Sequence, residues 1–128
     1  MASSSIKRMQ LEFEEAGSRR KTTYQPIKWD IRTSYPVWIR RHIIWKALIP
    51  LIKGKRNVVF LDAGCAEGYD VMKAVQHGVN YSIGVDFAAT TLQKMKKFTK
   101  ATESSYNIDC IRADIENLPF CSSVFDIV

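Results

Sequence analysis

The residues with the clearest potential for chemistry lie in one short stretch, Asp62-Ala63-Gly64-Cys65-Ala66-Glu67-Gly68. Glycines let the backbone turn tightly and let a ligand approach the main chain without a Cβ in between. Where a helix follows such a turn, its first N–H groups face the same ligand. Asp86 lies 22 residues after Gly64 and can accept two hydrogen bonds from a ribose diol. The pattern predicts a site for a ligand that contains a nucleoside.

The charges around this turn indicate which ligand it suits. Turns that bind dinucleotides have the pattern G-x-G-x-x-G, which brings a pyrophosphate to the helix N-terminus. Here Ala66 stands where the second glycine falls, and the acids Asp62 and Glu67 lie in the same turn. Two carboxylates repel a phosphate dianion and suit an ammonium or sulfonium group. The charges therefore favour S-adenosylmethionine, and an NAD-dependent dehydrogenase is the alternative.

The elements expected around this site alternate between strands and helices. Apolar runs predict four strands, at 58–61, 81–85, 108–113 and 125–128. Apolar residues at helical spacing predict helices between the strands, over 71–78 and 88–98. The alternation predicts an α/β fold, a Rossmann-like parallel sheet with flanking helices. Asp62, Asp86 and Asp114 each follow one of the first three strands, so they should meet at the edge where open α/β sheets bind ligands.

The last predicted strand stops at Val128. Parallel strands need neighbours that satisfy their backbone groups. We therefore expect either a sheet truncated after the fourth strand, in a longer natural protein, or a second chain that covers this edge. The second case would make the chain a non-catalytic fragment that binds S-adenosylmethionine or pairs with another subunit, as an oligomer, through the exposed fourth strand.

Residues 1–56 are predicted to form a helical, basic segment ahead of the α/β unit 57–128. The helix signal is strongest from Ser34 to Gly54, where a broad apolar stripe that includes Trp38 and Trp45 favours packing against a sheet. A membrane-surface helix is the alternative. Up to Asn57 there are 13 basic and 4 acidic residues, a net charge of +9, whereas the whole chain carries +6. This excess fits an anionic partner such as nucleic acid, or a solvated basic surface.

Composition is that of a globular protein. The chain has 128 residues, of which 46% are hydrophobic and 25% charged, which suits one domain and excludes a disordered protein. The sequence has no apolar run long enough to span a membrane and no secretory h-region, so a cytoplasmic location is expected. Three cysteines without CxxC spacing indicate free thiols, and the isolated His42 and His77 predict no metal site.

Residues 58–128 resemble the N-terminal half of a class I S-adenosylmethionine-dependent methyltransferase. The resemblance is carried by four blocks in the family's order: 61–68 (LDAGCAEG), 84–86 (GVD), 112–120 (RADIENLPF) and 125–128 (FDIV). They are most similar to the group that methylates small molecules. Ala66 departs from the glycine that the family pattern has at this position, a mild change that would weaken cofactor binding or shift the loop slightly.

The resemblance implies a cofactor site with assigned contacts. The methionine moiety would lie on the turn, at Asp62, Ala63, Gly64, Cys65, Ala66 and Gly68. Asp86 would take the ribose hydroxyls, with Phe87 beside the adenine. Asp114 would accept a hydrogen bond from the adenine amino group, with Ile115 supplying an adjacent backbone contact. The activity implied is methyl transfer from S-adenosylmethionine, which leaves S-adenosylhomocysteine, to an acceptor that is expected to be a small molecule.

Three points stay open at the level of sequence. No catalytic base can be named, because the family's acceptor-contacting residues follow the fourth strand or come from N-terminal helices, where Trp29 could shape a substrate lid. Cys65 could be a nucleophile at a helix N-terminus, but no base lies beside it, and a small residue in a tight turn is favoured. A nucleic-acid acceptor is the alternative that the basic N-terminal segment supports.

Overall fold

The computed structural model describes residues 35–102 and 106–128. Most of the predicted basic segment 1–56, including Trp29, lies outside the described residues. The described elements are α2 (Tyr35–Ile52), β1 (Val59–Ala63), α3 (Tyr69–Gln76), β2 (Tyr81–Asp86), α4 (Ala89–Thr102) and β3 (Ile108–Arg112).

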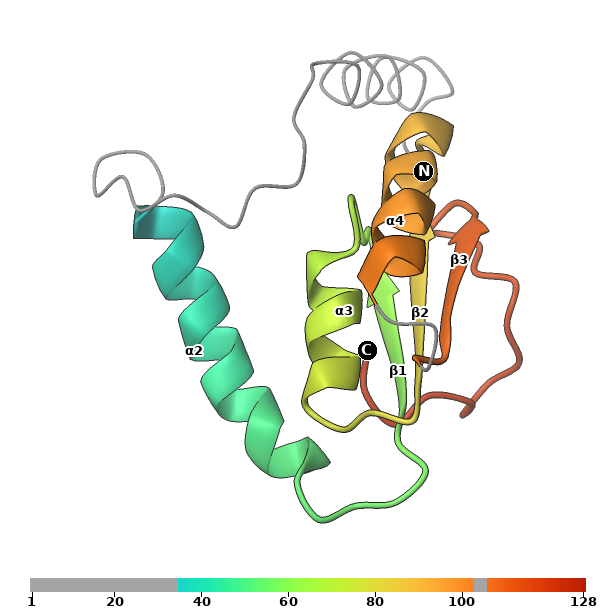
Figure 1. Cartoon of the computed structure of the whole chain (residues 1–128). Coiled ribbons are helices and arrows are strands. Elements are labelled where there is room, and N and C mark those ends of the chain that lie inside the picture. The colour runs from blue at the N-terminus through green and yellow to red at the C-terminus, as the bar shows by residue number, and fades with distance from the viewer. Residues whose placement is uncertain (1–34, 103–105) are drawn as a thin grey trace.

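The three strands form one parallel sheet in the order β1-β2-β3. The register pairs Leu61 of β1 with Ile83 of β2, and Ile83 with Asp109 of β3. Each strand is joined to the next by a helix, and Figure 1 shows the three arrows pointing the same way, with α4 in front of β2 and with β3 to the right of α4. The predicted α/β fold, a Rossmann-like parallel sheet with flanking helices, is therefore confirmed.

The predicted fourth strand is much shorter than expected. The described chain forms only a single parallel bridge there, between Ile127 and Phe60 of β1. The Leu61 N–H donates to the Ile127 carbonyl at 2.9 Å, and the Val59 N–H donates to the Asp126 carboxylate at 2.8 Å. Because the side chain of Asp126 takes a donor of β1, the backbone ladder does not extend toward residue 125.

This bridge nevertheless fixes the topology of the sheet. Strands β2 and β3 follow β1 in one direction, and the chain then returns to the other side of β1 at Ile127. The order of the strands thus reverses at β1. Open α/β sheets bind ligands beyond the carboxyl ends of the strands at such a reversal.

The sheet is covered on both faces. On the helix side, Val71 of α3 packs with Leu92 and Met95 of α4 and with Cys65. On the opposite face, the buried residues Leu61, Ile83 and Val85 pack against the segment after β3, through Leu118, Phe120 and Phe125. The rings of Phe120 and Phe125 meet edge to face at 4.9 Å. Burial on both faces agrees with the largely apolar sequences of β1 and β2, whereas β3 has no buried residue.

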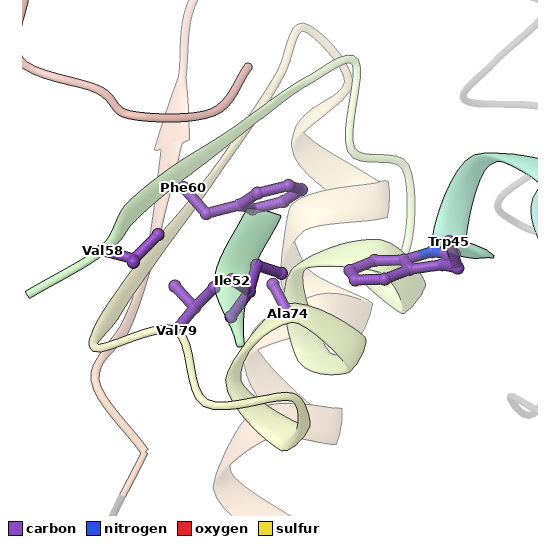
Figure 2. Close-up of a cluster of buried hydrophobic side chains, with 6 residues drawn as sticks. All are labelled: Trp45, Ile52, Val58, Phe60, Ala74 and Val79. Atoms are coloured by element: carbon purple, nitrogen blue, oxygen red, sulfur yellow. The ribbon is translucent and has the colours of Figure 1, made fainter. Parts of the chain in front are cut away.

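Helix α2 packs beside α3 and β1. Trp45 and Ile52, both 2% exposed, join Val58, Phe60, Ala74 and Val79 in a buried cluster. In Figure 2, Ile52 lies among Val58, Val79 and Ala74, while Trp45 lies at the edge of the cluster. The expected burial of Trp45 is confirmed, and its ring also stacks on His77 at 5.6 Å.

The buried stripe of α2 is narrower than the sequence predicted. Leu48 and Ile49 are partly buried against the same cluster, but Ile43, Ile44 and Leu51 are 61%, 48% and 50% exposed. Among the described residues, the buried side of α2 packs against α3, against Phe60 of β1 and against Val58 and Val79 in the neighbouring loops, whereas the opposite side of the helix is exposed. Within the described part of the chain, no helix combines the length and apolar character needed to cross a bilayer.

Candidate functional site

Three carboxylates lie at the carboxyl edge of the sheet. Asp62 is the penultimate residue of β1, Asp86 ends β2, and Asp114 comes two residues after β3. The Ala113 N–H donates to the Asp86 carbonyl at 3.2 Å, which keeps the chain after β3 beside the end of β2. The structure thus brings to one edge the three acids that the sequence singled out.

The Asp86 carboxylate joins the turn after β1 to the start of α4. One oxygen accepts the Ala66 N–H and the other accepts the Ala88 N–H, both at 2.9 Å. Each carboxylate oxygen has two lone pairs, so each can accept a further hydrogen bond. Asp86 therefore holds the turn in place and keeps acceptor capacity for a ligand.

The turn after β1 uses many of its own N–H groups. The N–H groups of Gly64 and Cys65 both donate to the Val85 carbonyl, at 2.7 and 2.9 Å. Ala66 has a φ of 47°, so an alanine holds the left-handed conformation at the position where the family has glycine. Ala63 and Gly64 are exposed and form the outer surface of the turn. The N–H groups of Gly64 and Cys65, like that of Ala66, are therefore engaged within the protein.

Cys65 faces the core. Its side chain is buried, and its Sγ lies 3.7 Å from the Sδ of Met95. Burial raises the pKa of the Cys65 thiol, and the nearby Asp62 and Asp86 raise it further. A thiolate nucleophile needs the opposite environment. The structure favours the packing role for Cys65, and only its backbone can reach a ligand at the turn.

Glu67 points to α4 rather than to the centre of the turn. Its carboxylate pairs with the Lys94 ammonium at 3.1 Å, and both side chains are partly exposed. The pair neutralises much of the charge that the sequence assigned to the site. Glu67 therefore adds little to the negative charge that Asp62, Asp86 and Asp114 bring to this edge.

The surroundings of Asp62 raise the pKa of its carboxyl group. Burial, then the nearby Asp70 carboxylate, raises its pKa from 3.8 to about 6, whereas Arg41 lowers it and Asp86 raises it. A carboxylate in this setting is short of positive charge. A cationic group beside it would favour its ionised form.

Two large apolar side chains stand exposed beyond the strand ends. Phe87, directly after β2, is 40% exposed, and Ile115, after β3, is 54% exposed. The Arg112 Nε donates to the Phe87 carbonyl at 2.9 Å, and the Asp114 carboxylate accepts the Glu116 N–H at 3.0 Å. These contacts fix the two loops and leave apolar surface beside the acids.

Sequence reasoning missed a group of residues between α2 and the first turn of α3. The Trp45 Nε1 donates to an Asp70 oxygen at 2.6 Å, and the Arg41 Nε lies 3.7 Å from the other oxygen. The Arg41 guanidinium also lies 4.2 Å from the centre of the Tyr69 ring. The four-residue spacing of Arg41 and Trp45 was a signal that they share one helix face.

Comparison with known proteins shows the family to which the chain belongs. Residues 60–128 match a family described as "Methyltransferase domain". The chain belongs to the class I S-adenosylmethionine-dependent methyltransferases. The resemblance inferred from the four sequence blocks is confirmed, and the acidic edge lies within the matched part of this methyltransferase.

Solved structures agree with the methyltransferase fold. An S-adenosylmethionine-dependent methyltransferase from Mesorhizobium loti is 27% identical, with a TM-score of 0.50 over 64% of this chain and 36% of that one. The YcgJ protein of Bacillus subtilis superposes with a TM-score of 0.59 at 23% identity, over 67% of this chain and 36% of that one. The second likeness concerns the fold alone.

Curated relatives include two proteins named tRNA U34 carboxymethyltransferase. The one from Shewanella woodyi is 25% identical over 59% of this methyltransferase chain and 23% of its own length. The one from Pectobacterium atrosepticum is 27% identical over 66% of this chain and 25% of its own length. The chain thus spans about a quarter of the length of these relatives.

Proposed function

We propose that this chain binds S-adenosylmethionine at the carboxyl edge of β1–β3 and that the protein transfers the methyl group to an acceptor. The observation that carries the proposal is the placement of Asp62, Asp86 and Asp114 at the carboxyl edge of a sheet whose strand order reverses at β1, in a member of the methyltransferase family. Ligands of open α/β sheets bind at that point.

The residues at the edge fit the chemistry of this cofactor. Its amino-acid end carries an ammonium group, and Asp62 lies half-buried with a pKa raised to about 6. Its ribose offers two hydroxyl donors, and both oxygens of Asp86 can accept further hydrogen bonds. Its adenine needs apolar surface, which Phe87 and Ile115 supply beside Asp114.

These residues would hold the cofactor and orient it for reaction. Asp62 would accept from the ammonium group, with the turn that runs from Ala63 through Gly64, Cys65, Ala66 and Gly68 beneath the methionine moiety. Asp86 would take the ribose, Phe87 and Ile115 would flank the adenine, and Asp114 would accept from its amino group. When bound, the cofactor supplies an electrophilic methyl group and leaves as S-adenosylhomocysteine. The chain's own contribution is position and orientation, and no residue is assigned as general base.

Thermal unfolding with added ligand tests the proposal. A ligand that binds the folded chain raises its midpoint of unfolding, by an amount that follows its concentration and affinity. We expect S-adenosylhomocysteine to raise the midpoint and NADH, at equal concentration, to leave it unchanged. A rise with NADH alone would support the dehydrogenase alternative instead.

Binding should depend on pH through Asp62. Because its pKa is about 6, a cation beside it must displace a proton below that pH. The affinity for S-adenosylhomocysteine is expected to be about tenfold lower at pH 5 than at pH 7. Calorimetric titration measures the difference, and Asp62→Asn should remove most of it. An unchanged affinity across this range would exclude Asp62 from the ammonium site.

The raised pKa of Asp62 also makes the free energy of unfolding depend on pH. The folded carboxyl of Asp62 holds its proton more tightly than the unfolded one, so the contribution of this group favours folding most when it is protonated. As pH rises from about 4 to about 6, this contribution to the free energy of unfolding falls.

The proposed acceptor is a small molecule, on the basis of the four sequence blocks. A nucleic acid is the second candidate, because two curated relatives carry tRNA in their names and residues up to Asn57 have a net charge of +9. Binding of tRNA that weakens steeply with added salt would favour the second candidate. Binding that salt leaves unaffected, or no binding, would favour the first.

A further inference from the structure

Helix α2 carries a cationic side chain to the acidic edge of the sheet. Arg41 lies over the ring of Tyr69 and pairs with Asp70, two residues in the first turn of α3. Trp45, one helical turn along α2, is buried and donates to the same Asp70 carboxylate. The buried indole thus anchors α2 at this point and sets the position of the guanidinium beside the turn that follows β1.

The guanidinium stands among more negative than positive groups. Asp62, Asp70 and Asp86 all act on this corner of the site, and Arg41 is the cation whose charge reaches Asp62. Lys94 is already paired with Glu67. Two cations stand beside these acids: Arg41 on α2, and Lys73 on α3, whose ammonium lies 5.7 Å from the centre of the same Tyr69 ring. The site thus offers both signs of charge close together.

Arg41 remains available to a ligand. Its side chain is 33% exposed, and its ion pair with Asp70 uses Nε at 3.7 Å, a long contact. The Asp70 carboxylate takes its short hydrogen bond from Trp45 instead. A guanidinium has five donors in a planar fork, which matches a carboxylate through two parallel hydrogen bonds.

We infer that Arg41 binds the α-carboxylate of the ligand's amino-acid end, while Asp62 takes the ammonium group of the same zwitterion. The inference rests on the proposed function, since it concerns the amino-acid half of the same ligand. It makes α2 a wall of the cofactor site and gives the chain a means of selecting ligands that carry a complete amino acid.

The test compares two ligands and three variants of the chain. S-Adenosylhomocysteine carries the amino-acid end, whereas 5′-methylthioadenosine shares the nucleoside and lacks it. Arg41→Ala should weaken binding of S-adenosylhomocysteine by about tenfold or more and leave binding of methylthioadenosine unchanged. Arg41→Lys keeps the charge without the fork and should give an intermediate loss. Arg40→Ala removes an exposed arginine from the adjacent position of α2 and should change neither affinity.

The outcomes separate this inference from the proposed function. An equal loss for both ligands would make Arg41 a support of the fold and overturn the inference, as would no loss for either. If the folded parent chain bound neither ligand, the proposed function itself would fail. Thermal unfolding of each variant shows whether the fold is kept, and Arg41→Lys retains the contacts of the side-chain stem should Arg41→Ala unfold.

Discussion

Gly68→Ala is expected to lower the free energy of unfolding by about 2–5 kcal/mol, as the sum of two costs. Gly68 precedes α3 with a φ of +83°, a conformation that costs a residue with a Cβ about 1–2 kcal/mol. The added Cβ would also lie 2.5 Å from Cγ and 2.8 Å from Sδ of Met95. Met95 is fully buried, so its side chain has little room to move, and overpacking costs about 1–3 kcal/mol.

Gly78→Ala is the matched control for the backbone cost. Gly78 has a φ of +99°, and a Cβ there meets nothing within 4 Å. Gly78→Ala should therefore lower the free energy of unfolding only by the cost of the left-handed backbone conformation, about 1–2 kcal/mol. Denaturant unfolding of both variants measures the difference. Equal losses would mean that the contact between the turn and Met95 on α4 is looser than the structure has it.

Asp86→Ala is expected to weaken binding of S-adenosylhomocysteine by about 10- to 150-fold. A charged acceptor of hydrogen bonds contributes about 1.5–3 kcal/mol, which converts to that range of affinity. The same carboxylate holds the N–H groups of Ala66 and Ala88, so the loss has a direct part and a part that acts through the turn. Calorimetric titration gives the total.

A change in the ligand separates the two parts. The 2′-deoxyribose analogue of S-adenosylhomocysteine lacks one of the hydroxyls that Asp86 is proposed to bind. It should bind the parent chain more weakly than S-adenosylhomocysteine does, and the two ligands should differ less on Asp86→Asn. Asp109→Asn, an exposed aspartate inside β3, is the control that should bind as the parent does. If the deoxy ligand bound more weakly than S-adenosylhomocysteine by the same factor in the parent chain and in Asp86→Asn, then Asp86 would only hold the turn and would not bind the ribose.

The strands and turns that form the site could be predicted, because the sequence patterns that specify them are local. The apolar run ending in Asp62 and the run ending in Asp86 are strands with turn residues directly after them, and the structure has them as β1 and β2. Parallel pairing follows from the helices between them. Three acids at one edge then follow from topology alone, without knowledge of any side-chain contact.

The charges inside the site could not be predicted, since they depend on partners far along the chain. Glu67 reads as a ligand-facing acid until Lys94, 27 residues on, is found beside it. Asp70 reads as an ordinary acid in a helix's first turn, but Trp45, 25 residues earlier, donates to it. The exposed side of α2 was mispredicted for a similar reason, because apolar spacing does not reveal how much of a helix finds a partner.

A crystal structure of the chain with S-adenosylhomocysteine tests the central claim most directly. We expect the ribose hydroxyls on the Asp86 carboxylate, the adenine beside Phe87 and Ile115, and the ammonium group at Asp62. Ligand density at another edge of the sheet, or an adenosine whose ribose makes no contact with Asp86, would contradict it.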